Sequence, residues 1–123
     1  MTKNRNSTKV TTRKKINLAI KSILEKKGAD VVLLDLRRRS PITNYFIICT
    51  ATSQPHAQAI CNEIYAKLKK NSVLPHHLEG VTNGQWVVLD YWDFIVHIFQ
   101  PETRAYYQLE MLWGDAPKKR YDS

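Results

Sequence analysis

Two short apolar runs constrain the fold of this chain more than any other feature of its sequence. Residues 31–34 read Val-Val-Leu-Leu, and residues 45–49 read Tyr-Phe-Ile-Ile-Cys. Successive side chains of a strand point to opposite faces of a sheet, so a strand without a polar side is buried on both faces. Both runs therefore predict central strands, whose sheet needs helices packed on it.

Helical periodicity flanks these runs. Apolar residues recur at helical spacing from Ile16 to Leu24, before Gly28, and again from Ala57 to Leu68, after an expected N-cap at Ser53. Pro101 opens a last helix that ends at Gly114, with Ala105, Leu109 and Leu112 facing inward.

Three further strands complete the pattern. We expect a short strand at residues 76–79 and two strands at residues 85–90 and 94–99, joined as a hairpin at Tyr91-Trp92. The order α-β-β-α-β-β-β-α predicts a single α/β domain with a mixed sheet of about five strands and helices packed on it.

The formal net charge of +8 is concentrated at the N-terminus, where no acidic residue precedes Glu25. We divide the chain into a flexible basic arm (residues 1–14), a folded domain (residues 15–117) and a basic C-terminal tail (residues 118–123). A basic arm binds polyanions through counterion release, which predicts non-specific contact with RNA. A solvated terminus without a ligand and an organelle transit peptide remain alternatives.

The cysteine content indicates a reducing environment, and the hydropathy gives no sign of a membrane-spanning helix. Cys49 and Cys61 both lie in apolar-periodic segments and are predicted to be core thiols, although a disulfide between them is an alternative. No apolar run approaches the ~18 residues of a membrane-spanning helix, and no secretory signal is recognisable. We expect a cytoplasmic protein rather than one of an organelle matrix.

The motifs of common enzymes and metal sites are missing. The chain contains neither a glycine-rich phosphate loop nor the G-x-S-x-G of a hydrolase elbow. His76 and His77 are adjacent, so on a strand they point to opposite faces and cannot chelate one metal together. We therefore expect no cofactor, no metal and no catalytic activity.

Residues 89–99 contain the strongest candidates for catalysis, Asp90, Asp93 and His97. The two carboxylates bracket a turn, where Asp commonly accepts backbone N–H bonds, and their D-x-x-D spacing makes the side chains diverge. His97 has apolar neighbours on its own face of the strand, which favours a satisfied core or interface residue over a catalytic one.

Aromatic residues offer a different function. Trp86, Tyr91 and Trp92 lie on the hairpin, and Tyr106, Tyr107 and Trp113 lie on the last helix. Trp and Tyr near polar turns are typical of binding hot spots, although each ring can instead fill a small core. That alternative is weakest for Trp92, because the tip of a turn is rarely buried within a monomer.

These residues also belong to ordered blocks that resemble the ribosomal silencing factor (Iojap) family. The blocks are Asp30-Val-Val-Leu-Leu-Asp35, Ser40-x-Ile-Thr-Asn-Tyr-Phe46, Thr50-Ala-Thr-Ser53, Glu79-Gly80, Trp86-Val-Val-Leu-Asp-Tyr91, Asp93 with Val96-His-Ile-Phe99, and Glu102-x-Arg104-x-x-Tyr107-x-Leu-Glu-x-Leu-Trp-Gly-Asp-Ala-Pro117. They cover roughly residues 15–117, in the order and at the spacing of the family.

The resemblance implies a nucleotidyltransferase-like architecture without catalysis. Such factors dock on ribosomal protein L-fourteen of the large ribosomal subunit, block association with the small subunit and so repress translation. By position, the resemblance implies that Trp86 and Tyr91 lie at the docking surface. Asp93, His97, Arg104, Tyr107 and Trp113 match the family signature, and some of them hold the fold rather than contact the partner. Trp92 joins the expected partner-binding residues because of its place at the turn.

The sequence departs from the family pattern at three loop positions. Trp92 replaces a common Gly, which predicts a different turn there because a Trp at positive φ is strained. Ala51 replaces another common Gly, and Pro55 replaces a polar residue.

Two other functions stay open at this point. A residual nucleotidyltransferase is suggested by the implied fold, and a general RNA-binding module is suggested by the basic arm. The exposed aromatic surface is also capable of pairing with a second copy of the chain, as a homodimer, when no ribosome is present.

Overall fold

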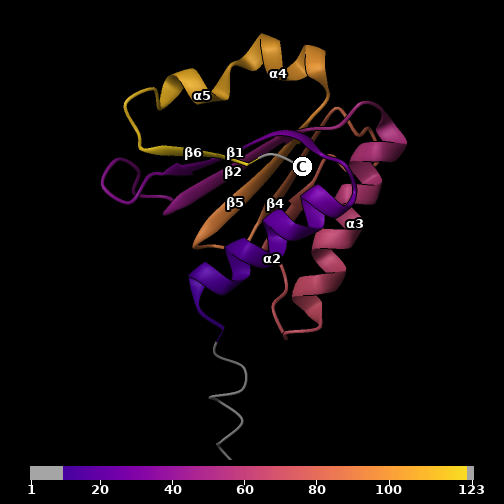
Figure 1. Cartoon of the computed structure of the whole chain (residues 1–123), viewed down its shortest axis with the longest axis horizontal. Coiled ribbons are helices and arrows are strands. Elements are labelled where there is room, and N and C mark those ends of the chain that lie inside the picture. Colours follow the sequence, from indigo (N-terminus) through magenta and orange to yellow (C-terminus); the bar gives the residue numbers. More distant parts are fainter. Residues whose placement is uncertain (1–9, 122–123) are drawn as a thin grey trace, which may run out of the picture.

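The computed structural model describes residues 10–121, in which one mixed sheet has the strand order β3-β4-β5-β2-β1-β6 (Figure 1). Its strands are β1 (Ala29–Asp35), β2 (Tyr45–Thr50), β3 (His77–Glu79), β4 (Trp86–Asp90), β5 (Phe94–Phe99) and β6 (Lys118–Tyr121). Strands β2 and β5 are parallel, and the other neighbouring pairs are antiparallel.

The two apolar runs form adjacent central strands, as predicted. Val32 of β1 pairs with Ile48 of β2, which in turn pairs with His97 of β5. Side chains at alternate positions enter two separate cores, one on each face of the sheet. The strands are therefore covered on both faces, which explains why their sequences lack a polar side.

Helices α2 (Thr12–Glu25) and α3 (Gln54–Lys69) pack side by side on the first face of the sheet (Figure 1). The expected N-cap of α3 is confirmed, because the Ser53 side chain accepts a hydrogen bond from the His56 N–H. Thr11 caps α2 in the same way, through the Lys14 N–H. This cap starts α2 within the segment that was expected to be a flexible arm; residues 1–9 of that arm lie outside the described residues.

His56 ties the start of α3 to the end of α2. Its Nδ1 accepts the Thr52 N–H at 2.9 Å, which leaves the proton on Nε2, and Nε2 donates to the Lys26 carbonyl oxygen at 2.7 Å. The histidine is thus a structural link between the two helices.

The second face of the sheet is covered by α4 (Pro101–Tyr107) and the one-turn α5 (Leu109–Leu112). One continuous helix was predicted here, and that prediction is wrong. Gln108 adopts the left-handed region with φ 45°, which rotates the second segment relative to the first. As a result Ala105 and Leu112 are exposed, and Leu109 alone of the three expected core positions packs against the core.

The basic residues after Pro117 form a sixth strand rather than the tail that was expected. Residues 118–121 pair antiparallel with Val31–Leu34 of β1, and residues 122–123 lie outside the described residues. The segment Lys-Lys-Arg-Tyr has no apolar alternation, so periodicity could not reveal it. Its pairing comes from the open edge of β1.

Both cysteines are buried and free, as predicted from their apolar surroundings. Burial raises the pKa of the Cys49 thiol to about 12 and that of the Cys61 thiol to about 11, so neither forms a reactive thiolate near neutral pH. Among residues 10–121, no helix is long and apolar enough to cross a membrane.

Deletion of residues 118–123 should remove β6 and lower the free energy of unfolding by about 2 kcal/mol, because β1 loses its hydrogen-bonded neighbour on one edge. Urea denaturation followed by circular dichroism measures the change. Deletion of residues 122–123 alone is the control and should leave stability unaltered. Equal stability of both truncated chains would contradict a structural role for β6.

Candidate protein-docking surface

The tip of the β4–β5 hairpin carries a tryptophan in an unfavourable backbone conformation. Trp92 has φ 73°, and the Asp93 N–H donates to the Tyr91 carbonyl oxygen across it at 2.9 Å, which describes a tight γ-turn of the strained, positive-φ kind. The expectation of a different turn was wrong. The position retains the conformation that suits glycine although a bulky side chain occupies it.

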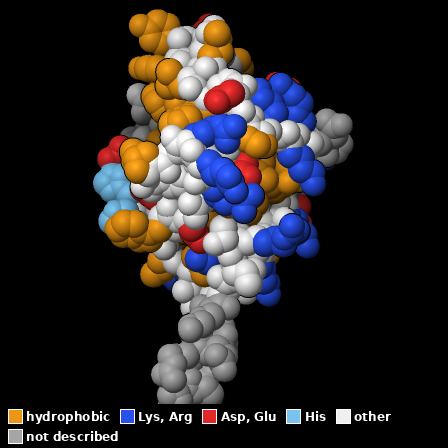
Figure 2. Space-filling model, turned by 90° about the vertical axis from the view of Figure 1, so that its left-hand side faces the viewer, with side chains coloured by type: hydrophobic (Ala, Val, Ile, Leu, Met, Phe, Trp, Pro, Cys, Tyr) orange, Lys and Arg blue, Asp and Glu red, His pale blue; other side chains and the backbone are white. Residues whose placement is uncertain are grey.

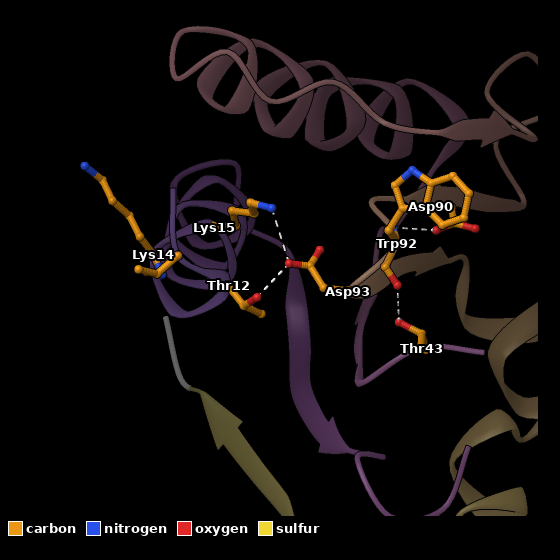
Figure 3. Close-up of polar contacts among 8 residues, drawn as sticks. Thr12, Lys14, Lys15, Thr43, Asp90, Trp92 and Asp93 are labelled. Atoms are coloured by element: carbon orange, nitrogen blue, oxygen red, sulfur yellow. Dashed lines mark hydrogen bonds and ion pairs between the residues drawn. The ribbon is translucent and has the colours of Figure 1, made fainter. Parts of the chain in front are cut away.

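Three contacts hold this strained turn in place, and those of Asp90 and Thr43 are drawn in Figure 3. The Asp90 carboxylate accepts the Trp92 N–H at 2.8 Å, as predicted for an Asp beside a turn, and the Thr43 hydroxyl donates to the Trp92 carbonyl oxygen at 3.0 Å. The Asn44 N–H donates to the Asp93 carbonyl oxygen. Surroundings that determine the backbone this fully are what allow a strained residue to persist.

Asp93 faces inward, toward the first turn of α2 (Figure 3). Its Oδ2 accepts a hydrogen bond from the Thr12 hydroxyl at 2.6 Å and forms an ion pair with the Lys15 ammonium at 3.3 Å. Its side chain is about one-fifth exposed. Asp93 therefore joins the hairpin to α2, and a direct contact of its carboxylate with a partner is not what this geometry supports.

The Trp92 indole itself lies in solvent, with 65% of the residue exposed. It stacks on the ring of His76, which is also exposed, with ring centroids 3.7 Å apart. We call Trp92 and His76 the hairpin tip. Stacking fixes the orientation of the indole without covering its outer face, so the tip presents a rigid aromatic surface.

Tyr91 does not belong to this surface. It is 3% exposed, stacks on Phe94 and packs in the core beneath α2 and α3. Burial raises the pKa of its phenol. This burial does not support the partner-binding role expected of Tyr91. The γ-turn reverses the chain between Tyr91 and Trp92 and sends the two side chains to different sides.

His97 is also buried, at 6% exposure, which contradicts direct contact with a partner. Its Nδ1 accepts the indole N–H of Trp86 at 3.1 Å, and Phe46 packs against its ring. Burial lowers the pKa of His97 to about 3, so the imidazole is neutral. A neutral histidine within an aromatic core orients Trp86 and has no exposed proton to transfer.

Trp86, Tyr107 and Trp113 form the boundary between this core and the solvent. Trp86 packs on Phe99 and on Tyr107, with ring centroids 4.9 and 4.7 Å apart, and Trp113 packs edge-on against Phe46 at 6.3 Å. Both tryptophans are half-buried, whereas Tyr107 is 50% exposed. The three residues support the outer surface of α4 and α5 and contribute part of their own rings to it.

Arg104 clamps α4 and α5 to the sheet. Its guanidinium forms two hydrogen bonds of 3.0 Å with the Glu110 carboxylate and two of 2.8 Å with the Asp30 carbonyl oxygen and the Thr50 hydroxyl. The ion pair holds the pKa of Glu110 below its usual range. Because these bonds occupy four of its five N–H donors, Arg104 is a positioning residue, and its expected contact with a partner is not supported.

The outer side of α4 and α5 carries an apolar surface that sequence analysis largely missed. Tyr106, Tyr107, Met111 and Leu112 are 50–80% exposed, and we call them the helical patch. Figure 2 shows apolar side chains gathered over this end of the molecule. Sequence analysis did not single out Met111. It missed Leu112 because a continuous helix would have turned this residue inward, and only the break at Gln108 exposes it.

The described residues offer no group of three or more His, Cys, Asp or Glu side chains able to hold a metal ion. Asp90 and Asp93 point in different directions, toward their own turn and toward α2. This region thus presents exposed aromatic side chains that are supported by buried polar contacts.

Comparison with known proteins identifies the family. The model of the family described as ribosomal silencing factor during starvation, RsfS, matches residues 9–123. The chain is 38% identical over 102 residues to the ribosomal silencing factor RsfS of Halalkalibacterium halodurans, which covers 83% of this chain and 87% of that protein. This chain belongs to the RsfS family.

Solved structures agree with that assignment. A Chromobacterium violaceum crystal structure superposes with a TM-score of 0.83 at 32% sequence identity, covering 85% of this chain and 88% of the other. RsfS-family relatives also include the chloroplastic Iojap protein of Zea mays, which is 33% identical over 103 residues. The matched region makes up 42% of the maize protein. The recognition of an Iojap-like silencing factor with an α/β fold is confirmed.

Replacement of Trp92 by Gly and by Ala should separate the effect of the positive φ at this position from the effect of losing the indole. Trp92→Gly relieves the positive φ, whereas Trp92→Ala retains it, so the glycine variant should be more stable than the alanine variant by about 1 kcal/mol. Urea denaturation measures the difference. Equal stabilities would contradict a strained turn at Trp92.

The buried His97 should make stability fall in acid. Its pKa in the folded state, about 3, is lower than the 6.5 of a free histidine, so its contribution is fully present above pH 6.5 and is lost as pH falls from 6.5 toward 3. Between pH 7 and pH 5 the loss should be about 2 kcal/mol. His97→Phe should show a correspondingly flatter pH dependence in urea denaturation; an unchanged slope would contradict a buried neutral imidazole.

Proposed function

We propose that this protein binds the large ribosomal subunit through ribosomal protein L-fourteen and blocks association with the small subunit, which represses translation. It acts by occupying a surface and has no catalytic turnover. The hairpin tip and the helical patch make the contact, with Trp86 and Trp113 partly exposed beneath the patch.

Trp92 is the observation that carries this proposal. A left-handed backbone costs a residue other than glycine about 1–2 kcal/mol, and an exposed indole adds apolar surface to the solvent-facing side of the molecule. Neither property stabilises the isolated chain. Both are accounted for when the indole inserts into a partner, because a rigid, pre-oriented Trp is typical of an interface hot spot.

The names of the relatives support the choice of partner. Bacterial relatives are named ribosomal silencing factors, and a mouse relative, 28% identical over 101 residues, is named mitochondrial assembly of ribosomal large subunit protein 1. Ribosomal proteins are generally basic, and the half-buried Asp90 beside the hairpin tip provides complementary charge.

The buried residues of the family signature act through these exposed ones. Asp93 holds the tip against α2, His97 orients Trp86, and Arg104 holds the helical patch on the sheet. We further propose a cytoplasmic location and self-association of the free protein through the helical patch, which binding to the ribosome would replace.

Sedimentation with isolated large subunits tests the function. Trp92→Gly should weaken binding at least tenfold, because it removes a hot-spot indole while relieving the turn. Tyr65→Ala removes an aromatic ring from α3 that belongs to neither the hairpin tip nor the helical patch, and should bind as the unmodified protein does. Undiminished binding of Trp92→Gly, or no co-sedimentation of the unmodified protein, would overturn the proposal.

Crosslinking identifies the partner directly. A photoreactive amino acid at position 92 should crosslink to ribosomal protein L-fourteen, whereas the same group at position 91 should not, because Tyr91 is buried. Subunit joining measured by light scattering should be inhibited by the unmodified protein and much less by Trp92→Gly. Nucleotide transfer with Mg²⁺ that is lost in Asp90→Asn would instead favour a residual nucleotidyltransferase.

A further inference from the structure

Basic side chains gather along the edge of the sheet formed by β1 and β6, the opposite edge from β3. Figure 2 views this side of the molecule and shows Lys and Arg side chains over its middle. They come from three segments that lie far apart in the sequence: the first turn of α2, the β1–β2 loop and β6. We call this surface the basic edge; it consists of Arg13, Lys14, Arg37, Arg38, Arg39, Lys118, Lys119 and Arg120.

Two hollows connect these segments into one surface. Arg13 and Lys119 line a groove of about 240 Å³ between α2 and β6, together with Tyr45 and Tyr121. The three arginines of the β1–β2 loop line a second hollow, of about 420 Å³, beside Pro117, the residue before β6. The basic edge therefore follows β6 from one end to the other.

The carboxylates nearby leave most of this charge uncompensated. Asp35 is paired with Arg37, and Asp115 with Arg39. Glu110 lies near Lys118 and Arg120, but it is already bound by the Arg104 guanidinium. Within residues 10–121, the other cations of the basic edge, those of α2 and β6 together with Arg38, form no ion pair.

We propose that the basic edge binds the phosphate backbone of RNA without selecting a base sequence. Evenly distributed Lys and Arg side chains neutralise phosphates and release counterions, which favours any polyanionic backbone. Base stacking is disfavoured at the two nearest aromatic rings, because Arg37 already lies over a face of Tyr45 and Lys119 over a face of Tyr121, at 5.4 and 5.1 Å from the ring centroids. The contacts are therefore to phosphates.

An anionic membrane is the main competing ligand, and the surface suits it less well. Membrane-surface binding combines cations with apolar side chains that enter the interface. Within the three segments of the basic edge, as far as the structure describes them, Ile42 in the β1–β2 loop is the one strongly exposed large apolar residue. β6 itself is an exposed strand of charged residues, which also disfavours pairing with a strand of another protein.

The identity of the RNA rests on the proposed function. The hairpin tip and the basic edge meet at the first turn of α2, where Thr12 and Lys15 bind Asp93 while Arg13 and Lys14 belong to the basic edge. A large subunit bound at the hairpin tip would place its neighbouring ribosomal RNA beside these cations.

Fluorescence anisotropy with a short labelled RNA duplex tests the proposal with the full chain and without ribosomes. The triple variant Lys118→Gln, Lys119→Gln, Arg120→Gln retains residues able to form β6. It should lose at least tenfold in affinity, and its slope of log K against log salt should become flatter by about 2–3, between about 50 and 200 mM salt.

A matched control removes the same charge elsewhere. Lys26→Gln, Lys69→Gln, Lys70→Gln changes three exposed lysines at the ends of α2 and α3 and should keep the affinity within about twofold and the salt slope unchanged. Equal losses in both variants would overturn the proposal, since net charge alone would then explain binding. Unchanged binding of the β6 variant would overturn it too.

Two more measurements separate this inference from the proposed function. Trp92→Gly should bind the RNA duplex normally even though it fails to bind large subunits, so either proposal can fail while the other holds. Vesicles that contain phosphatidylserine should bind the protein more weakly than RNA does at the same salt; tighter binding to the vesicles would assign the basic edge to a membrane instead.

Discussion

Burial of β5 on both faces is the constraint on which the rest of this structure depends. Each residue from Phe94 to Phe99 is buried, with β2 on one side and β4 on the other. One face of β5 contacts the core beneath α2 and α3, and the other contacts the aromatic core beneath α4 and α5. A strand enclosed in this way leaves functional side chains only at its ends and on its neighbours.

This enclosure divides the residues expected to bind a partner into two groups. Asp93, His97 and Arg104 form their hydrogen bonds inside the chain: Asp93 with α2, His97 with Trp86, and Arg104 with Glu110 and the sheet. Trp92 and Tyr107 remain exposed. Buried polar contacts position a small number of aromatic side chains, which is how a binding surface is kept rigid before its partner arrives.

The first turn of α2 connects the two surfaces that carry function in our proposals. Its Thr12 and Lys15 hold the hairpin tip through Asp93, and its Arg13 lines the groove of the basic edge. A protein contact through aromatic anchors supplies affinity and specificity, whereas an RNA contact through cations supplies attraction that depends on salt. The hairpin tip and the basic edge both adjoin the first turn of α2, so a partner bound at one of these surfaces would bring the ligand of the other surface close to it.

The sequence by itself determined the central strands, the two long helices, the cap at Ser53, the buried cysteines and the family, because these depend on local periodicity and on ordered blocks. Only the tertiary structure decided which apolar side chains are exposed and whether the basic C-terminal segment forms a strand. The γ-turn separates Tyr91 from Trp92, the left-handed Gln108 exposes Leu112, and the open edge of β1 turns a basic tail into β6. Each of these outcomes depends on a backbone conformation or on a neighbour distant in sequence, and neither leaves a periodic signal in the chain.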